Sequence, residues 1–203
     1  HHTYDKPYEF YFSSLRDKPV KLFEIGTGGY DNPEAGGNSL RMWKEYFNHL
    51  DTQILAMDIF DKEKIQEERI TIFKGSQWDE AFLDSIADKI SGANIIIDDG
   101  SHVNKDQQIA FKKLFPLLKD GGIYVIEDTH TAAWKHYGGG GPDNTVEFIK
   151  GLVNGLQYKS LATEMRNDSL VPGEPSYFEE NITSINFYNG MIFITKGDNS
   201  ITA

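Results

Sequence analysis

The sequence predicts an α/β fold with a mostly parallel, seven-stranded sheet that ends in an antiparallel hairpin. Two observations predict it. Short apolar runs alternate with amphipathic helical segments, which is typical of βαβ units whose parallel sheet is covered on both faces. The last two apolar runs follow each other directly and meet at Asn189-Gly190, a dipeptide that favours the positive φ angles of a tight hairpin turn.

Seven apolar segments are candidate strands. In order they are KLFEIG (21–26), QILAMD (53–58), ITIFK (70–74), NIIIDD (94–99), GIYVIE (122–127), ITSINFY (182–188) and GMIFITK (190–196). Helical patterns are expected near 37–49, 79–91, 104–118 and 144–157. Two longer stretches, 129–143 with its run of four glycines and 158–181, exceed simple connections, and such loops in compact domains are usually functional or mobile.

Length and composition indicate one ordinary globular domain over residues 1–203, with 39% hydrophobic and 25% charged residues. No apolar run approaches the roughly 20 residues of a membrane span, and no signal-peptide pattern opens the chain, so no membrane partner is expected. The absence of cysteine removes disulfides and thiolate chemistry and fits a cytoplasmic location. His1 and His2 are either a tag remnant or native residues.

The formal charge of −11 argues against a nucleic-acid partner, because nucleic-acid binders usually present a basic face. It favours a small acceptor that is uncharged or cationic. The oligomeric state is left open, with a homo-oligomer among the alternatives.

A glycine-rich turn follows the first strand, where open α/β sheets bind ligands. Gly26 and Gly28 fit a dinucleotide fingerprint, but its third glycine position is occupied by Asp31. Glu24 would repel a pyrophosphate and suits a ligand with a positive end, such as S-adenosylmethionine. The alternative is a turn that needs its glycines for steric reasons alone.

The next strand ends also carry polar side chains. Asp58 ends the second strand, where an acid commonly accepts hydrogen bonds from the ribose hydroxyls of adenosine. Gln77, Trp78 and Asp79 follow the third strand and could surround an adenine, although Asp79 equally suits a helix N-cap. With Asp98 at the end of the fourth strand, the set favours adenosine with a cationic tail over NAD.

Acidic pairs end the fourth and fifth strands, which are neighbours in a doubly wound sheet. Asp99, Glu127 and Asp128 would repel one another unless a cation lies among them. Oxygen ligands favour Mg²⁺, or Mn²⁺ or Ca²⁺, over zinc. The alternative is that these acids point separately into water.

A histidine follows the first acidic pair by three residues. His102 lies next to the predicted metal cluster and to Asp98, so it is our candidate general base. His130 and His136 compete for this role, and spacing alone does not exclude them.

Several long motifs resemble one family, the metal-dependent sugar O-methyltransferases of macrolide and related antibiotic pathways, which include the mycinamicin and tylosin deoxysugar enzymes and the rhamnosyl enzymes. The resemblance covers roughly residues 3–135. It is carried by FEIGTGGYDNPEAGGNSLRMWKEYF (23–47), MDIFDK (57–62), IIIDDGSHVN (95–104) and FKKLFPLLKDGGIYVIEDTHTAAW (111–134). Position 76 departs from the family, which more often has Asp where this chain has Ser. In some members this domain follows an additional N-terminal domain.

The resemblance implies a Rossmann-like class I methyltransferase domain and a set of site residues. S-adenosylmethionine is expected at Glu24, Gly26, Gly28, Asp58, Gln77 and Asp98, and Mg²⁺ at Asp99, Glu127 and Asp128, with His102 as the base. Ser39 and Arg41 match the family's GGxSLRMW run and are assigned to cofactor binding or loop support. Residues 136–181 match little and are expected to select the substrate.

The expected function is Mg²⁺-dependent methylation of a natural-product hydroxyl, with a sugar on a macrolide-like scaffold as the favoured acceptor. Alternatives are a non-sugar polyketide or peptide–polyketide hydroxyl and a non-catalytic module that binds S-adenosylmethionine. A dehydrogenase is disfavoured by Asp31 and Glu24.

Overall fold

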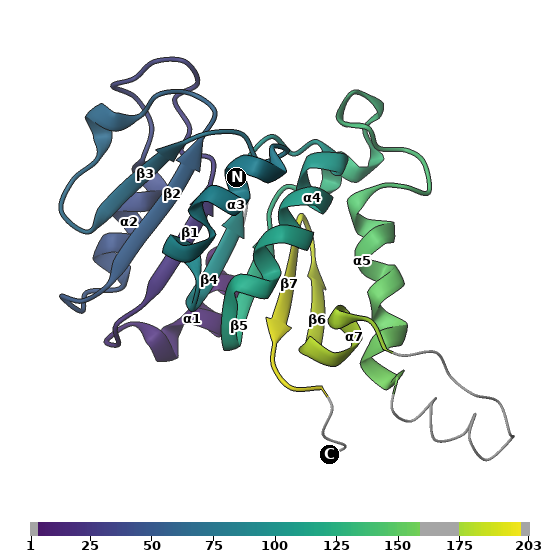
Figure 1. Cartoon of the computed structure of the whole chain (residues 1–203). Coiled ribbons are helices and arrows are strands. Elements are labelled where there is room, and N and C mark those ends of the chain that lie inside the picture. Colours follow the sequence, from purple (N-terminus) through teal and green to yellow (C-terminus); the bar gives the residue numbers. More distant parts are fainter. Residues whose placement is uncertain (1–3, 159–174, 200–203) are drawn as a thin grey trace, which may run out of the picture.

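Seven strands form one mixed sheet in the order β3-β2-β1-β4-β5-β7-β6 (Figure 1). The computed structural model describes residues 4–158 and 175–199, so His1, His2 and most of the predicted 158–181 loop lie outside the described residues. Strands β1 to β5 pair in parallel, and β7 pairs antiparallel with both β5 and β6. The predicted parallel sheet with a terminal antiparallel hairpin is confirmed. That 1–203 is a single domain stays a prediction.

The observed strands match the predicted segments closely. They are β1 Lys21–Ile25, β2 Gln53–Asp58, β3 Ile70–Lys74, β4 Ala93–Asp98, β5 Leu118–Ile126, β6 Ile182–Tyr188 and β7 Met191–Lys196. Only β5 departs by more than a residue or two, because it begins four residues before the predicted Gly122, through Leu118 pairing with Ala93.

Of the α-helices within the described residues, four were predicted and two were not. The predicted ones are α2 Asn38–Tyr46, α3 Glu80–Ile90, α4 Asn104–Leu114 and α5 Thr145–Val153; the additional ones are α1 Asp5–Phe12 and α7 Tyr177–Asn181. Short 3-10 turns connect the elements at η1 Ser13–Leu15, η2 Glu63–Ile65, η3 Phe115–Leu117, η4 Thr129–Ala133, η5 Lys135–Tyr137 and η6 Asn154–Gln157. Pro116 lies in η3 and helps to end the α4 segment there, short of the predicted residue 118.

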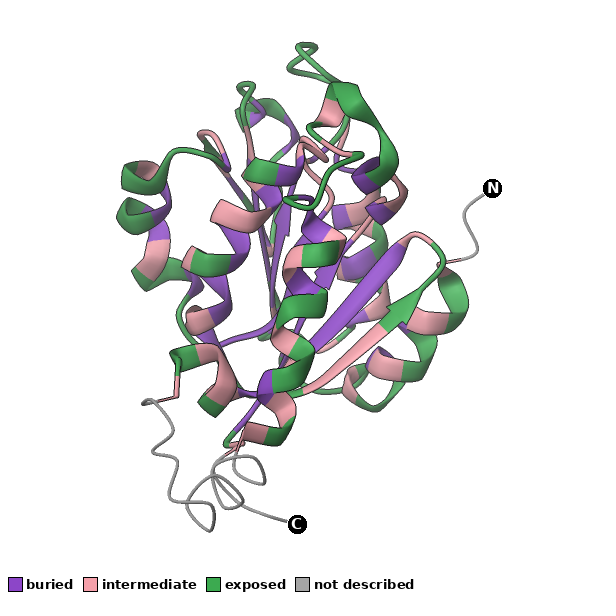
Figure 2. Ribbon diagram, turned by 90° about the vertical axis from the view of Figure 1, so that its right-hand side faces the viewer, coloured by how far each residue is buried: buried purple, intermediate pink, exposed green. Residues whose placement is uncertain are grey.

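Helices cover both faces of the sheet, and each face has its own apolar core. Residues of α3, α4 and α5 pack on one face against side chains such as Phe23 and Ile96. Residues of α1 and α2 pack on the other, against side chains such as Leu22 and Ile97. Buried residues lie along the strands and on the inner helix surfaces, whereas the outer helix surfaces are exposed (Figure 2). Within the described residues, no helix is both long and apolar enough to cross a membrane.

The turn between β6 and β7 also contacts the start of the chain. Gly190 has a φ of +80°, whereas its neighbour Asn189 keeps a negative φ, so only one residue of the predicted turn dipeptide is left-handed. A side chain at Gly190 would place its Cβ 2.5 Å from the hydroxyl oxygen of Tyr4. This hairpin therefore holds the residue that precedes α1 close to the end of β5.

Replacing Gly190 with alanine should lower the free energy of unfolding by about 2 kcal/mol, because the left-handed backbone and the crowded Cβ both oppose a side chain. Urea denaturation measures this value. Gly151→Ala is the matched control, since Gly151 lies within α5 and a Cβ added there would meet no atom within 4 Å. That change should be neutral or stabilise by up to about 1 kcal/mol. Equal changes in the free energy of unfolding for Gly190→Ala and Gly151→Ala would contradict the close contact between Gly190 and Tyr4.

Candidate active site

A row of carboxylates crosses three neighbouring strands at their carboxyl ends. Glu24 lies in β1, Asp99 follows β4 and Glu127 follows β5, and the strand order places β4 between the other two. Because side chains alternate between the two faces of a strand, all three acids point to the same face as the core residues that pack against α1 and α2. The row therefore lies at the edge of that face.

Neutral groups donate hydrogen bonds to three of the acids. Glu24 is 2% exposed and accepts one from the Trp43 indole at 2.7 Å and another from the Ser39 hydroxyl. Glu127 accepts one from the hydroxyl of Tyr8, and Asp128 accepts one from the hydroxyl of Tyr4 at 2.7 Å. None of these donors carries a charge. They satisfy the oxygens without neutralising the acids.

Asp99 differs from its neighbours, because no residue that the structure describes donates a hydrogen bond to its carboxylate. Burial, followed by the charges of Glu127 and Glu24, raises the pKa of Asp99 to about 9. Burial also raises the pKa of Glu24 and that of Glu127 to about 7. These carboxylates are costly to ionise together without a cation, and Asp99 is the one that no described residue supports with a hydrogen bond.

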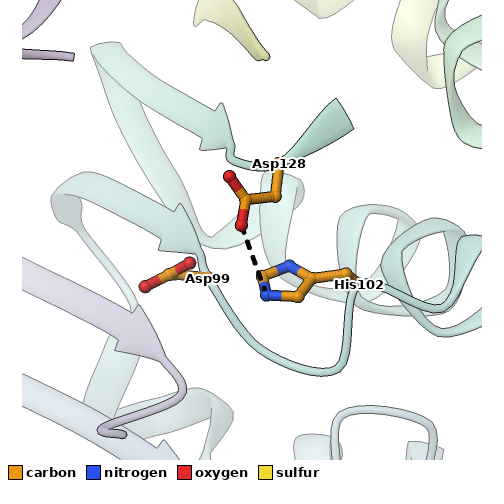
Figure 3. Close-up of side chains that lie close together, drawn as sticks. All are labelled: Asp99, His102 and Asp128. Atoms are coloured by element: carbon orange, nitrogen blue, oxygen red, sulfur yellow. Dashed lines mark ion pairs between the residues drawn. The ribbon is translucent and has the colours of Figure 1, made fainter. Parts of the chain in front are cut away.

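Asp128 and His102 complete the cluster around Asp99 (Figure 3). Ligand atoms of Asp99, His102 and Asp128 all lie within 4.8 Å of one another, and the His102 Nε2 is 3.7 Å from a carboxylate oxygen of Asp128. Both His102 (φ +56°) and Asp128 (φ +50°) have left-handed backbones, which turn their side chains toward this point. A backbone strained at two facing positions is common at functional sites.

The surroundings of His102 favour the neutral form of its imidazole. Burial is the main cause that lowers the pKa of His102, partly opposed by the charge of Asp128. The Nδ1 atom is buried and has no hydrogen-bond partner among the described residues. His130 and His136 are not members of this cluster: the His130 ring meets Trp134 edge to face at 4.9 Å between ring centroids, and the His136 ring stacks on Trp134 at 5.7 Å. Of the three candidate bases, His102 is the one that the structure groups with Asp99 and Asp128.

Asp98, which precedes Asp99 at the end of β4, points to the opposite face of the sheet from this row of acids. Asp98 is completely buried, and burial raises its pKa to about 7. It accepts a hydrogen bond from the Gln77 amide at 3.2 Å, and Gln77 in turn accepts one from the Ser101 backbone at 2.7 Å. Asp98 therefore holds Gln77 and the turn before His102. Its direct contact with a cofactor stays a prediction.

A cavity of about 510 Å³ runs from Asp58 to His102, within the range of small-molecule sites. Its lining includes most of the predicted residues, namely Gly26, Gly28, Asp58, Gln77, Asp99 and His102. Gly26 has a φ of +90°, and a Cβ there would lie 2.3 Å from the Asp99 carbonyl oxygen, so only glycine fits. Asp58 accepts hydrogen bonds from the backbone and hydroxyl of Thr27 at 3.0 and 2.7 Å.

Five predicted residues are not part of the lining of this cavity, namely Glu24, Ser39, Asp98, Glu127 and Asp128. Ser39 lines a smaller adjoining hollow, and Glu24 lines neither, because it is enclosed by Ser39 and Trp43. Arg41 donates to the Gly36 carbonyl at 3.2 Å and so supports the glycine loop. Asp79 is the N-cap of α3, bonded to the backbone of Phe82, whereas Trp78 lines the cavity and is half exposed.

Three further positions support the site and were not identified from the sequence. Lys62 is 1% exposed and donates to the carbonyls of Asn32 and Ala35 at 2.8 and 3.0 Å, which fastens the glycine loop. The hydroxyls of Tyr4 and Tyr8 donate hydrogen bonds to the carboxylates of Asp128 and Glu127, respectively. The four-residue spacing of Tyr4, Tyr8 and Phe12 is the signal that could have indicated helix α1.

The loop over residues 129–143 is closely bonded to the cavity wall. Asn104, buried at the start of α4, donates to the Tyr137 carbonyl at 2.8 Å, and Tyr137 lines the cavity beside His102. Backbone bonds from Gly139 to Trp134 and from Gly140 to Ala132 close its glycine run into a turn. Movement of this loop stays a prediction. In the structure its glycines form a hydrogen-bonded turn.

The chain is similar over nearly its own whole length to curated sugar O-methyltransferases. The mycinamicin VI 2''-O-methyltransferase of Micromonospora griseorubida is 37% identical over 203 residues, which are 98% of this chain and 49% of that protein. The 8-demethyl-8-alpha-L-rhamnosyl tetracenomycin-C 2'-O-methyltransferase of Streptomyces olivaceus is 40% identical over 202 residues, 98% of this chain and 51% of that protein. The chain thus spans about half the length of the curated relatives it matches. No protein-family model matches it.

Solved structures agree with this similarity. The MycE methyltransferase of the mycinamycin biosynthetic pathway, in complex with Mg, SAH and mycinamycin VI, has a TM-score of 0.88 at 37% identity over 98% of this chain and 50% of that chain. A second MycE complex, with Mg and SAH, has a TM-score of 0.87. The predicted class I methyltransferase fold and the predicted family resemblance are both confirmed.

The raised pKa values lead to a prediction about metal-free protein. A carboxyl whose pKa is higher in the folded than in the unfolded state makes the free energy of unfolding fall as pH rises between the two values. For Asp99 that window runs from 3.8 to about 9. In EDTA, thermal scans should therefore show a falling Tm from about pH 5.5 to about pH 8.5, and Asp99→Asn should flatten this fall.

The slope of the free energy of unfolding against pH should become shallower by at most about 1.4 kcal/mol per pH unit for each proton that the protein no longer releases on unfolding. The matched control is Asp88→Asn, since Asp88 is exposed on α3. It should keep the slope of the unsubstituted protein. If the fall of Tm with pH were unchanged in Asp99→Asn, ionisation of Asp99 would not be what destabilises the metal-free protein.

Proposed function

Because this chain is homologous over nearly its whole length to sugar O-methyltransferases of macrolide and tetracenomycin pathways, we propose that it methylates a sugar hydroxyl of a glycosylated natural product. The methyl donor is S-adenosylmethionine and the metal is Mg²⁺. The observation that carries the proposal is the partly buried carboxylate of Asp99, which faces other acids and receives no hydrogen bond from the described residues.

The cofactor residues in this proposal are those that form the cavity and its walls. Gly26, Gly28 and Gln77 line the space, and the Asp58 carboxylate at its far end suits a ribose. Glu24, Ser39 and Asp98 support these walls from behind. S-adenosylmethionine supplies a sulfonium-bound methyl group to an attacking oxygen. The acids near the cavity match the positive charge of that donor.

The donor set fits a hard divalent cation. Asp99 and Asp128 offer carboxylate oxygens at one point, with Glu127 beside them, and such oxygens are preferred by Mg²⁺. Mn²⁺ or Ca²⁺ could replace it on the same chemistry. Bound Mg²⁺ supplies positive charge that lowers the pKa of a nearby hydroxyl. The family resemblance places Glu127 on the metal and His102 off it, and we propose the same assignment for this chain.

His102 is the proposed general base. Its neutral imidazole can accept the proton of the acceptor hydroxyl at Nε2, and the Asp128 carboxylate 3.7 Å away would stabilise the imidazolium that forms. Tyr137 and its hydrogen-bonded loop line the cavity beside His102, where they would hold the acceptor close to this nitrogen. Positioning of the two reactants supplies much of the remaining rate.

The acceptor is proposed from the relatives rather than from the cavity. Their names specify sugars, as in the rhamnosyl tetracenomycin and the L-olivosyl-oleandolide enzymes. A polyketide hydroxyl without a sugar would use the same residues and is the second candidate. A non-catalytic module is disfavoured, because the acids and His102 lie together at the cavity. A nucleic-acid partner is not proposed, and the cytoplasmic location stays a prediction.

Removing the base or the central acid should greatly reduce turnover. His102→Ala should slow methyl transfer to mycinamycin VI or to a rhamnosylated tetracenomycin by about 10²–10⁴-fold, and Asp99→Ala should remove Mg²⁺ dependence together with activity. Both variants should still bind S-adenosylhomocysteine in calorimetry, because neither side chain carries the ribose contacts.

His49→Ala serves as the control, since His49 is a partly exposed histidine whose Nδ1 lies 3.8 Å from a carboxylate oxygen of Asp51. It should retain the rate of the unsubstituted protein. Turnover that persists in both His102→Ala and Asp99→Ala would contradict the proposed mechanism.

A further inference from the structure

Helix α1 and the residue before it place two phenol hydroxyls on the acids of the proposed metal site. The Tyr8 hydroxyl donates to a carboxylate oxygen of Glu127, 119 positions away in the chain. The Tyr4 hydroxyl donates to Asp128 at 2.7 Å and to the Gly190 carbonyl at 3.3 Å. Neither contact is needed for the apolar packing of α1, since a phenylalanine ring would fill the same space.

The ring of Tyr8 is fixed on all sides. Only 9% of the residue is exposed, and its ring lies 5.2 Å from Phe12, 5.0 Å from Trp43 and 5.7 Å from Phe193 between ring centroids. Trp43 itself donates to Glu24, the acid at the other end of the row. A hydroxyl on a ring packed in this way helps to set the position of the carboxylate oxygen to which it donates.

The chemistry of these bonds suits the support of a metal ligand. A neutral hydroxyl occupies one oxygen of a carboxylate without cancelling its charge, so the carboxylate remains able to bind a cation. Carboxylates that hold metals are usually hydrogen-bonded in this way, which fixes their orientation. An amine or guanidinium in place of the phenol would compete with the metal for the same charge.

We propose that Tyr8 and Tyr4 are positioning residues that hold Glu127 and Asp128 for a divalent cation, so that helix α1 is part of the metal site. The inference rests on the Mg²⁺ site of the proposed function. It gives the start of the chain a role in binding the metal, which the motifs of the sequence do not assign.

Tyr8→Phe tests this role, because it deletes one oxygen and keeps the ring. Calorimetric titration of Mg²⁺ in the presence of S-adenosylhomocysteine should give a Kd about 10-fold higher or more. The control is Tyr11→Phe on the same helix, where the hydroxyl bonds that of Tyr188, at 3.5 Å, away from the acids. Its Kd should not change. Tyr4→Phe, at a half-buried position, should weaken Mg²⁺ in the same direction and remains informative where Tyr8→Phe folds poorly.

A double-mutant cycle separates positioning from general loosening of the fold. In the background of Glu127→Gln, Tyr8→Phe should add little further loss of Mg²⁺ affinity, because its effect passes through that carboxylate. Tm values in EDTA report stability separately. Unchanged Mg²⁺ affinity in Tyr8→Phe and Tyr4→Phe, with normal binding by the unsubstituted protein, would overturn this inference alone. An unsubstituted protein that binds no Mg²⁺ would overturn the metal site of the proposed function as well.

Discussion

Mutual repulsion among closely spaced, mostly half-buried carboxylates is the constraint on which the rest of this site depends. Glu24, Asp99 and Glu127 project from adjacent strands to one side of the sheet, and Asp128 joins them through a left-handed turn. Hydroxyl and indole groups from α1 and α2 satisfy the outer acids and leave Asp99 without a donor among the described residues. Such an arrangement favours the cation-bound protein over the cation-free protein, which connects the electrostatics of the fold to its proposed chemistry.

Strand alternation separates the two tasks of the site. Consecutive residues of β4 and its extension point to opposite faces, so Asp98 enters the core beside Gln77 while Asp99 joins the acidic row. The turn of Gly100 and Ser101 then returns the chain to His102 at the cavity. One continuous stretch of sequence thus supports the cofactor cavity, the proposed metal and the proposed base.

Much of this could be predicted from the sequence, because strands and their polar ends are local signals. Apolar runs located all seven strands, and the acidic pairs were placed together by the rule that parallel strands align their carboxyl ends. The contacts of Tyr8 with Glu127 and of Lys62 with the glycine loop join distant segments, and no local pattern reports them. The burial of Glu24 and Asp98 behind the cavity was likewise set by packing, since alternation gives the face of a side chain but not its depth.

The proposed chemistry depends most on the binding of a divalent cation beside Asp99. Anomalous diffraction from crystals grown with Mn²⁺ and S-adenosylhomocysteine tests this binding most directly, since Mn²⁺ takes similar oxygen ligands to Mg²⁺ and is visible by its anomalous signal. We expect one strong anomalous peak in contact with carboxylate oxygens of Asp99 and Asp128. A structure with S-adenosylhomocysteine bound and no peak at these oxygens would contradict the proposed metal site.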